Sequence, residues 1–553
     1  MFKIDNDEPF GHSLAIYNGN KSLSMTSGAF SEYSSNYSID NNPKYIKEVH
    51  QSFIDVGADI IQTNSFGGTP MVLDEYDLSN KAEEINFQSA VIAKSVSAKN
   101  PGTLVAGSMG PTTKLLSLTQ IKTSEITFDY LMENYRVQAR GLISGGSDLL
   151  LVETSQDILN VKAAIEGINL AKSDLSVFDI PLAIQCTIEN MGTTLAGQDI
   201  ESFYLSIIQN DLLWVGMNCA TGPKFMREHL RTLNQISKHP IALIPNAGLP
   251  DENGNYNEIP KEFAKVVNEY VSNGWVNIIG GCCGTIPPHI SELKTISDNA
   301  TIFFDDTKNV SKMNKSHFVT GLETIYVDDE TKPIMVGERT NVLGSRKFKK
   351  LIENDDFDLA SEIGKLQIKS GANVLDVCLQ NTERNEIEDI ENFLEKLTSK
   401  IKAPIMIDST DPEVIKTSMK LCPGKIIINS INLEDGEEKF ELIVPYAKKY
   451  GALLIIGCID EDKEQAQAIT SERKLEIAKR SYNLLISKYG FPANQIIFDP
   501  LTFPVGTGDV NYLESAKHTV EGINQIKQHL PESKTILGIS NVSFGLPSSG
   551  REV

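Results

Sequence analysis

Long apolar runs and an excess of positive charge are both missing from this chain, and each absence excludes a class of protein. No apolar run approaches the roughly 18 residues that a membrane-spanning helix requires. The 51 Lys and Arg residues are outnumbered by 73 Asp and Glu residues, and the resulting net charge of −22 repels the phosphates of nucleic acids. We therefore expect neither a membrane nor a nucleic acid as a partner.

Secretion signals and disulfide patterns are missing as well. The first residues, Met-Phe-Lys-Ile-Asp-Asn-Asp-Glu-Pro, lack the apolar core of a signal peptide. The seven cysteines are an odd number spread over 553 residues, which is not the pattern of a disulfide-stapled secreted protein. The expected location is the cytoplasm.

The chain does contain a regular alternation of short apolar runs with amphipathic stretches of helix length. Strands that are separated by helices pair in parallel. Seven such runs, with a weak first one at Leu23–Met25, predict an eightfold βα barrel in the first half. The seven runs lie at residues 58–64, 103–107, 147–152, 181–186, 212–217, 241–244 and 276–279.

The second half repeats this rhythm after a polar stretch at residues 301–332, which we interpret as a linker and lead-in. Its apolar runs lie at residues 333–336, 373–377, 404–407, 425–429, 452–457, 495–498 and 535–539. The expected fold class is therefore α/β, with two tandem TIM-type (β/α)8 barrels at residues 1–300 and 333–553. The second barrel is expected to be truncated after its seventh strand, as in a fragment or one part of a split enzyme.

Three cysteines follow apolar strands of the first barrel, at the end of the strands where such barrels carry their active sites. Cys219 follows one strand, and Cys282 and Cys283 follow another within Gly-Gly-Cys-Cys-Gly. Adjacent strand residues point to opposite faces, but the flanking glycines permit other backbone conformations. Three thiolates with one open position are typical of a catalytic zinc, which activates a bound thiol. Ordinary buried cysteines are the alternative that spacing alone leaves open.

Several segments of the first half resemble the homocysteine methyltransferase family. Residues 216–219 (Gly-Met-Asn-Cys) and 280–284 (Gly-Gly-Cys-Cys-Gly) are similar to its signature, and residues 245–250 (Pro-Asn-Ala-Gly-Leu-Pro) resemble its methionine synthase branch. The further matching segments, in the order that the family shows, are residues 58–66, 106–111 and 148–154. The resemblance implies that Cys219, Cys282 and Cys283 hold zinc, that homocysteine sulfur is the fourth ligand, and that Glu153 helps to hold the homocysteine amino group.

One position departs from this family. Where the family has an acid that helps to bind the substrate, the corresponding stretch here begins with Ser27. The departure bears on which amino acid binds and how tightly, and it does not touch the cysteines.

In the second half, three polar residues directly follow apolar strands: Asp408, Asn429 and Asp499. A pterin presents a flat edge of N–H donors, which carboxylates accept well. A single such residue is more often a helix N-cap, but three on nearby strands favour a binding site.

The second half also resembles the methyltetrahydrofolate-binding domain of methionine synthases. Residues 336–348 are similar to the opening of that domain, and residues 537–545 are similar to the seventh strand of folate–corrinoid methyltransferases. The resemblance implies that Asp408, Asn429 and Asp499 read the pterin ring, while Asn541 bonds the nitrogen that carries the methyl group and assists its protonation. Cys378 departs from the family, which has asparagine there.

Together the two resemblances imply a methyltransferase that makes methionine from homocysteine, with 5-methyltetrahydrofolate as methyl donor and cobalamin as carrier. None of the eight histidines follows an aspartate by two residues, as the cobalamin motif Asp-x-His-x-x-Gly requires. We therefore expect cobalamin to be carried by a separate module or protein, acting in trans. Two alternatives stay open: a corrinoid-dependent methyltransferase with a different thiol or methyl donor, and a non-catalytic folate-binding fragment.

Overall fold

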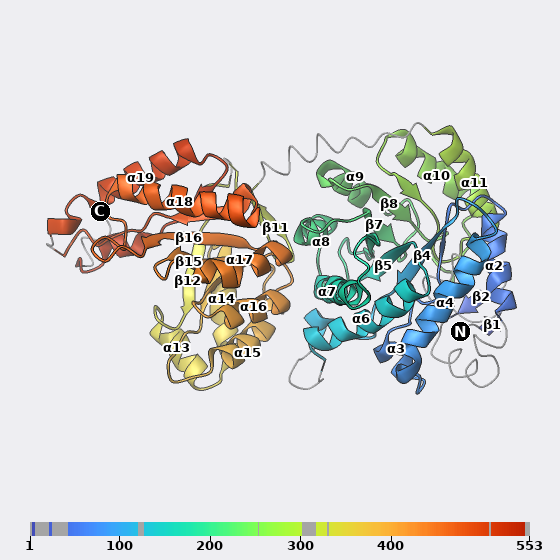
Figure 1. Cartoon of the computed structure of the whole chain (residues 1–553), viewed down its shortest axis with the longest axis horizontal. Coiled ribbons are helices and arrows are strands. Elements are labelled where there is room, and N and C mark those ends of the chain that lie inside the picture. Colours follow the sequence, from blue (N-terminus) through green and yellow to red (C-terminus); the bar gives the residue numbers. More distant parts are fainter. Residues whose placement is uncertain are drawn as a thin grey trace. The chain divides into compact units, whose positions relative to one another are not determined.

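The computed structural model of the chain describes residues 43–119, 126–252, 254–300, 317–328, 331–507 and 510–547, together with the backbone of residues 3–5 and 22–24. The chain divides near residue 310 into two compact units, and each contains a parallel sheet of seven strands (Figure 1). This arrangement confirms the expected α/β class and the tandem barrel-like sheets. Among the described helices, none combines the length and the apolarity that crossing a bilayer requires.

The first sheet has the order β3-β4-β5-β6-β7-β8-β9, and every neighbouring pair is parallel. Its strands are β3 (Ile60–Gln62), β4 (Leu104–Met109), β5 (Leu149–Ser155), β6 (Leu182–Cys186), β7 (Trp214–Asn218), β8 (Ile241–Ile244) and β9 (Ile278–Ile279). All seven predicted strands are confirmed to within a few residues.

Helices surround these strands in a ring (Figure 1). They are α2 (Lys44–Ile54), α4 (Ala82–Ser97), α6 (Phe128–Ser144), α7 (Ile158–Leu175), α8 (Ile200–Ile207), α9 (Arg227–Ile236), α10 (Pro260–Ser272) and α11 (Pro287–Asn299), with the short α3 (Pro70–Asp74) before α4. Polar side chains cap several of them: Thr127, for example, accepts from the Tyr130 N–H at α6, and Asp157 accepts from the Leu159 N–H at α7.

The weak strand expected at Leu23–Met25 does not join this sheet. A strand, β2 (Ser22–Ser24), is present, but it pairs antiparallel with β1 (Lys3–Asp5) in a separate two-stranded sheet. Pairing with the nearest strand in the sequence closes a shorter loop than pairing with β3 would, and therefore costs less chain entropy. The prediction of an eighth strand in the first sheet is wrong for this structure.

The inner face of the first sheet follows the two-residue period of its strands. Buried side chains near the N-terminal ends form the inner core: Ala106, Leu149, Leu151, Ala183, Trp214 and Ala242. Two residues further along β5 from Leu151 comes Glu153, and polar residues occupy the equivalent places on neighbouring strands. The alternation thus places apolar side chains toward the N-terminal ends of the strands and polar side chains toward their C-terminal ends.

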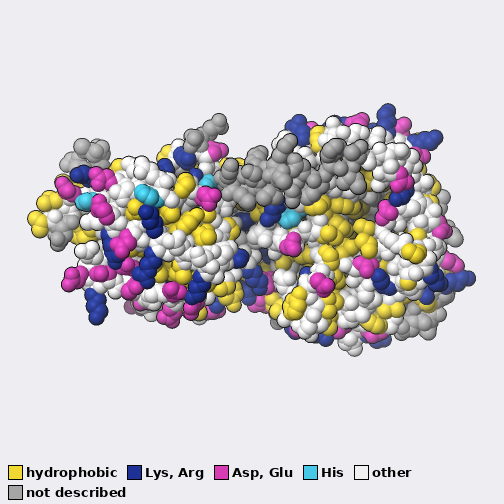
Figure 2. Space-filling view, turned by 45° about the horizontal axis from the view of Figure 1, so that its top comes forward, with side chains coloured by type: hydrophobic (Ala, Val, Ile, Leu, Met, Phe, Trp, Pro, Cys, Tyr) yellow, Lys and Arg dark blue, Asp and Glu magenta, His cyan; other side chains and the backbone are white. Residues whose placement is uncertain are grey.

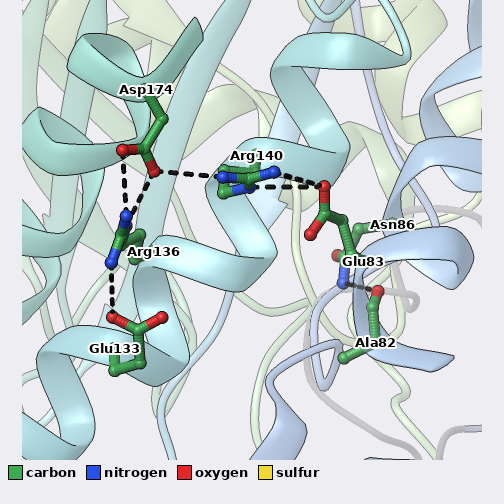
Figure 3. A network of polar contacts seen from close by, with 7 residues as sticks. All are labelled: Ala82, Glu83, Asn86, Glu133, Arg136, Arg140 and Asp174. Carbon is green, nitrogen blue, oxygen red and sulfur yellow. Dashed lines mark hydrogen bonds and ion pairs between the residues drawn. The ribbon is translucent and has the colours of Figure 1, made fainter. Parts of the chain in front are cut away.

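A charged network joins three helices on the outside of the first unit (Figure 3). Arg136 on α6 donates two parallel hydrogen bonds to Asp174 on α7, at 2.7 and 2.9 Å. Arg140, one turn further along α6, bonds Asp174 at 3.2 Å and Glu83 on α4 at 3.3 Å. The network fixes the register of these helices on the surface, away from the C-terminal ends of the strands.

The second sheet has the order β12-β13-β14-β15-β16-β17-β18, again with parallel neighbours. Its strands are β12 (Val336–Asn341), β13 (Val374–Cys378), β14 (Ile405–Asp408), β15 (Ile427–Leu433), β16 (Leu453–Asp460), β17 (Ile496–Asp499) and β18 (Lys534–Thr535). Its helices are α13 (Arg346–Glu353), α14 (Phe357–Lys369), α15 (Glu386–Thr398), α16 (Pro412–Leu421), α17 (Glu438–Tyr450), α18 (Ser471–Tyr489) and α19 (Ser515–His529). A hairpin of β10 (Phe318–Thr320) and β11 (Thr324–Tyr326) packs Val319 and Ile325 against the inner core.

Two strands of the second sheet differ from the prediction. β12 begins at Val336, where the apolar run ends, and continues through the polar residues to Asn341 with a register shift against β13. β18 ends at Thr535, and Ile539–Ser543 form a 3-10 helix, η6, instead of the end of a strand. An apolar run therefore marks these strands without locating their ends.

Lys and Arg side chains are interspersed with Asp and Glu side chains on the face of each unit that Figure 2 shows.

Candidate functional sites

Three cysteine thiols meet at the C-terminal end of the first sheet. Cys219 directly follows β7, and Cys282 and Cys283 lie in the loop after β9. Their sulfur atoms all lie within 4.8 Å of one another, and those of Cys219 and Cys283 are 3.6 Å apart. Tetrahedral zinc with bonds of about 2.3 Å to sulfur requires sulfur–sulfur separations of about 3.8 Å. The donor set and its spacing therefore fit one zinc ion.

The backbone explains how adjacent cysteines can converge. β9 ends at Ile279, so Cys282 and Cys283 lie outside the alternation of a strand. The Cys283 N–H donates to the Asn246 side chain at 3.1 Å, which fixes the loop from the neighbouring strand end. Gly284 has φ +77°, and a Cβ there would meet Tyr256 at 2.2 Å. The glycine thus permits both the turn and the close approach of Tyr256.

Hydrogen bonds among these groups distribute the protons unequally. Bonds from the Cys219 and Cys282 thiols, and a further one from the Tyr256 hydroxyl, lower the pKa of Cys283 well below its usual value. The pKa of Cys282 is raised, because its thiol bonds to Cys219 and Cys283 and is buried. Of these two thiols, Cys283 is therefore the one that ionises first, and binding a divalent cation would displace the remaining protons.

Glu153 lies deep in the same end of the first sheet, with no exposed surface. Its carboxylate accepts from the Ser108 hydroxyl at 2.6 Å and from the Asn218 amide at 3.3 Å. The Asn218 amide nitrogen is also 4.0 Å from the Cys282 sulfur, so one side chain bridges the carboxylate and the thiols. Thr154 and Cys219 have φ of +54° and +63°, and such strain in non-glycine residues is common at functional sites.

A second polar cluster occupies the C-terminal end of the second sheet. Asp408 and Asn429 are register neighbours on β14 and β15. Asn429 donates to the Asp376 carboxylate at 3.3 Å, and Asn341 donates to Asp408 at 3.3 Å. The structure therefore brings two of the predicted residues together with Asp376 and Asn341, to which the sequence analysis gave no role. The sequence does contain a signal for Asp376: it lies two residues after the buried Val374 on one strand, so both side chains point to the same face of the sheet.

Both carboxyl groups of this cluster are harder to ionise than usual. Burial raises the pKa of Asp376 to about 7, and the nearby Asp408 and Glu338 add to the effect. Burial also raises the pKa of Asp408, against the opposing effect of a hydrogen bond with the Cys378 thiol. The thiol that stands where the resembled family has asparagine therefore contacts the cluster directly.

We expect the Asp376→Asn substitution to change how stability depends on pH. A carboxyl whose pKa rises on folding contributes stability below its unfolded pKa of about 4, and this contribution is lost as the pH rises through about 7. The variant should therefore gain stability relative to the unmodified protein between pH 4 and pH 8, by about 3 to 4 kcal/mol. Urea unfolding midpoints at both pH values measure the gain. Parallel pH dependence of the two proteins would contradict it.

The two remaining predicted residues lie further along the sheet. Asp499 ends β17, and its carboxylate accepts from the Leu501 N–H at 2.9 Å. Asn541 is exposed on η6, and among the described residues no hydrogen bond joins its side chain to Asp408, Asn429 or Asp499. Among the described residues, Asn541 is therefore not part of the hydrogen-bonded cluster.

Comparison with known proteins separates the two halves in the same way. Residues 11–297 match the homocysteine S-methyltransferase family, and residues 337–552 match the pterin binding enzyme family. The metallated form of the homocysteine methyltransferase MmuM from Escherichia coli is 20% identical, with a TM-score of 0.39, and the match covers 49% of this chain and 89% of that chain. Its oxidized form is 21% identical over the same shares, with a TM-score of 0.38. A 2-naphthoyl-CoA reductase complex is 10% identical over 90% of this chain and 82% of that chain, with a TM-score of 0.30.

Proposed function

The chain belongs to the homocysteine S-methyltransferase family, and from this premise we propose that it makes methionine from homocysteine, with 5-methyltetrahydrofolate as the methyl donor. The observation that carries the proposal is the cluster of three thiols at the C-terminal end of the first sheet. A second domain of the pterin binding family supports the choice of donor.

In the first unit, Cys219, Cys282 and Cys283 would hold a zinc ion through their sulfur atoms. When bound, zinc lowers the pKa of an incoming thiol, so that homocysteine is presented as the nucleophilic thiolate. Glu153 would accept from the ammonium group of the amino acid, because an ionised carboxylate accepts hydrogen bonds at both of its oxygens and forms strong charge-assisted bonds with an ammonium. Asn218 holds that carboxylate at a fixed position relative to the thiols.

In the second unit, Asp408, Asn429 and Asp499 would accept from and donate to the polar edge of the pterin ring. The protonated form of Asp376, which burial keeps populated up to about neutral pH, can donate a hydrogen bond as well as accept one. Asn541 would bond the nitrogen that carries the methyl group. That nitrogen must gain a proton as the methyl departs, because the nitrogen of a tertiary amine is otherwise a poor leaving group.

The methyl group needs a carrier between the two sites, and we propose cobalamin on a separate module or protein. The resemblance to methionine synthases supports this carrier, whereas this sequence has no Asp-x-His-x-x-Gly motif to ligate its cobalt. A different thiol or methyl donor is the competing proposal, favoured by Ser27 and by the contact of Cys378 with Asp408.

Assays of the two half-reactions with free cobalamin test the proposal. Cob(I)alamin is supplied as acceptor for 5-methyltetrahydrofolate, and in a separate assay methylcobalamin is supplied as donor for homocysteine. We expect both to proceed, with products quantified by mass spectrometry, and other thiols to react at least tenfold more slowly than homocysteine. A different preferred thiol would favour the competing proposal, and absence of both half-reactions would contradict a catalytic role.

A further inference from the structure

Lys474 is a fully buried lysine on α18, beside the loop that follows β17. Its ammonium donates to the carbonyl oxygens of Ala468 at 2.8 Å and Leu501 at 3.3 Å, and it also bonds the carbonyl of Pro500. An ammonium has three N–H donors, so these three carbonyls satisfy it. Burial of such a group is costly, and the bonds that offset the cost all go to the loops that follow β16 and β17.

The loop that Lys474 holds carries Asp499. Leu501 has φ +61°, which is strained for a residue with a branched side chain, and its N–H donates to the Asp499 carboxylate at 2.9 Å. The Leu501 carbonyl accepts from Lys474 and also from the Thr519 hydroxyl, at 3.0 Å. The strained turn that orients Asp499 is therefore held at its carbonyl by two donors from different helices.

The groups that face the Lys474 ammonium include one carboxylate. They are the Cys458 thiol from β16, Asp499 from β17, the ring of Phe503 at 5.1 Å and Thr519 from α19. Burial lowers the pKa of Lys474 to about 8, while Cys458 and Asp499 oppose that effect. Burial raises the pKa of Asp499, which the Leu501 N–H and the positive charge of Lys474 both oppose. At neutral pH the two groups thus stabilise each other's charged forms.

We propose that Lys474 is a positioning residue for the pterin site, where its ammonium holds the loop after β17 and keeps the Asp499 carboxylate in place beside a fixed positive charge. The inference rests on the proposed function, since Asp499 is one of the residues that would read the pterin. It extends that function to a residue on α18 that acts through the loop carrying Asp499.

The Lys474→Met substitution tests the proposal in the full chain, because methionine keeps most of the buried stem and removes the charge. Lys488→Met is the matched control, since Lys488 is on the same helix but is exposed and paired with Glu437 and Glu441. By hydrogen exchange with mass spectrometry, amide exchange in residues 499–507 should be at least tenfold faster in Lys474→Met and unchanged in the control.

Binding of 5-methyltetrahydrofolate, measured against pH, separates positioning from mere stability. In Lys474→Met, Asp499 lacks the neighbouring ammonium and should hold its proton to higher pH. The affinity of this variant for 5-methyltetrahydrofolate should therefore be about tenfold lower than that of the unmodified protein at pH 6, and the difference should shrink toward pH 8.5. A loss of affinity that is equal at all pH values would overturn the proposal. So would a Lys474→Met protein in which neither the amide exchange nor the binding of 5-methyltetrahydrofolate changes. Lys474→Arg keeps the charge and should keep the pH profile of the unmodified protein, even if Lys474→Met does not fold.

The exchange measurement also separates this inference from the proposed function. If the unmodified protein does not bind 5-methyltetrahydrofolate, the proposed function fails for the second unit. Faster exchange in Lys474→Met, confined to residues 499–507, would still support the role of Lys474 in holding the loop after β17. Unchanged exchange would overturn that role.

Discussion

The Cys282→Ser substitution should abolish zinc binding and the reaction with homocysteine. Removing a residue outside the ligand set of a metal site typically costs 10- to 100-fold in affinity, so loss of a direct thiolate ligand should cost at least about 100-fold. Zinc content, measured after dialysis against a weak chelator, should fall from about one ion per chain to a small fraction. Serine is nearly isosteric, so the buried loop at Cys282 should keep its fold.

Proton release gives a second readout of the same prediction. A free thiol with a pKa near 8.5 is mostly protonated at pH 7, so binding as a thiolate should release about one proton per homocysteine. Calorimetry in buffers of different ionisation enthalpy counts these protons. We expect release in the unmodified protein and none in Cys282→Ser.

Cys186→Ala is the matched control for this prediction. Cys186 ends β6 in the same unit and is equally buried, but it is not one of the three clustered thiols. It should retain zinc and proton release. Equal zinc loss in both variants would indicate general unfolding, and retention of zinc in Cys282→Ser would refute the assignment of this ligand.

The strands of both sheets could be predicted because each is an apolar run bounded by polar residues, and the structure confirms these runs. The prediction is wrong where local pairing or a polar strand decides the outcome. β2 pairs with β1 instead of joining the first sheet, and β12 continues through polar residues after Gly337. Neither feature depends on apolar periodicity, which is the signal that predicts the other strands.

The candidate site residues show a similar division. Cys219 and Cys282 follow strands of the first sheet, and Asp408 ends a strand of the second. For each residue, a position at the C-terminal end of its own sheet could be inferred from the rule that parallel strands end at one face. Tyr256 reaches Cys283 from a loop, through a contact that Gly284 permits, and no periodic pattern marks such a residue. Lys474 reads in the sequence as one more helical lysine, and only its burial against the loop after β17 distinguishes it.

The second large effect is expected for Asp408→Asn, which should weaken binding of 5-methyltetrahydrofolate by roughly 30- to 150-fold. Asp408 can accept through both carboxylate oxygens, whereas asparagine replaces one acceptor by an N–H donor that would face the N–H donors of the pterin. Loss of a charge-assisted bond, together with an unpaired buried donor, costs about 2 to 3 kcal/mol, from which the expected factor follows. Calorimetric titration of the full chain measures it.

The Asp411→Asn substitution provides the control, because Asp411 lies only three residues beyond Asp408 but caps α16, where it accepts from the Glu413 N–H at 2.8 Å. Asparagine caps helices as well as aspartate does, so this variant should bind the folate normally. Zinc content should be unchanged in both variants, since the thiols belong to the other unit. If Asp408→Asn binds the folate as tightly as the control does, Asp408 does not read the pterin. The Asp376 carboxyl, which is more deeply buried and accepts from Asn429, would then be the acceptor to test next.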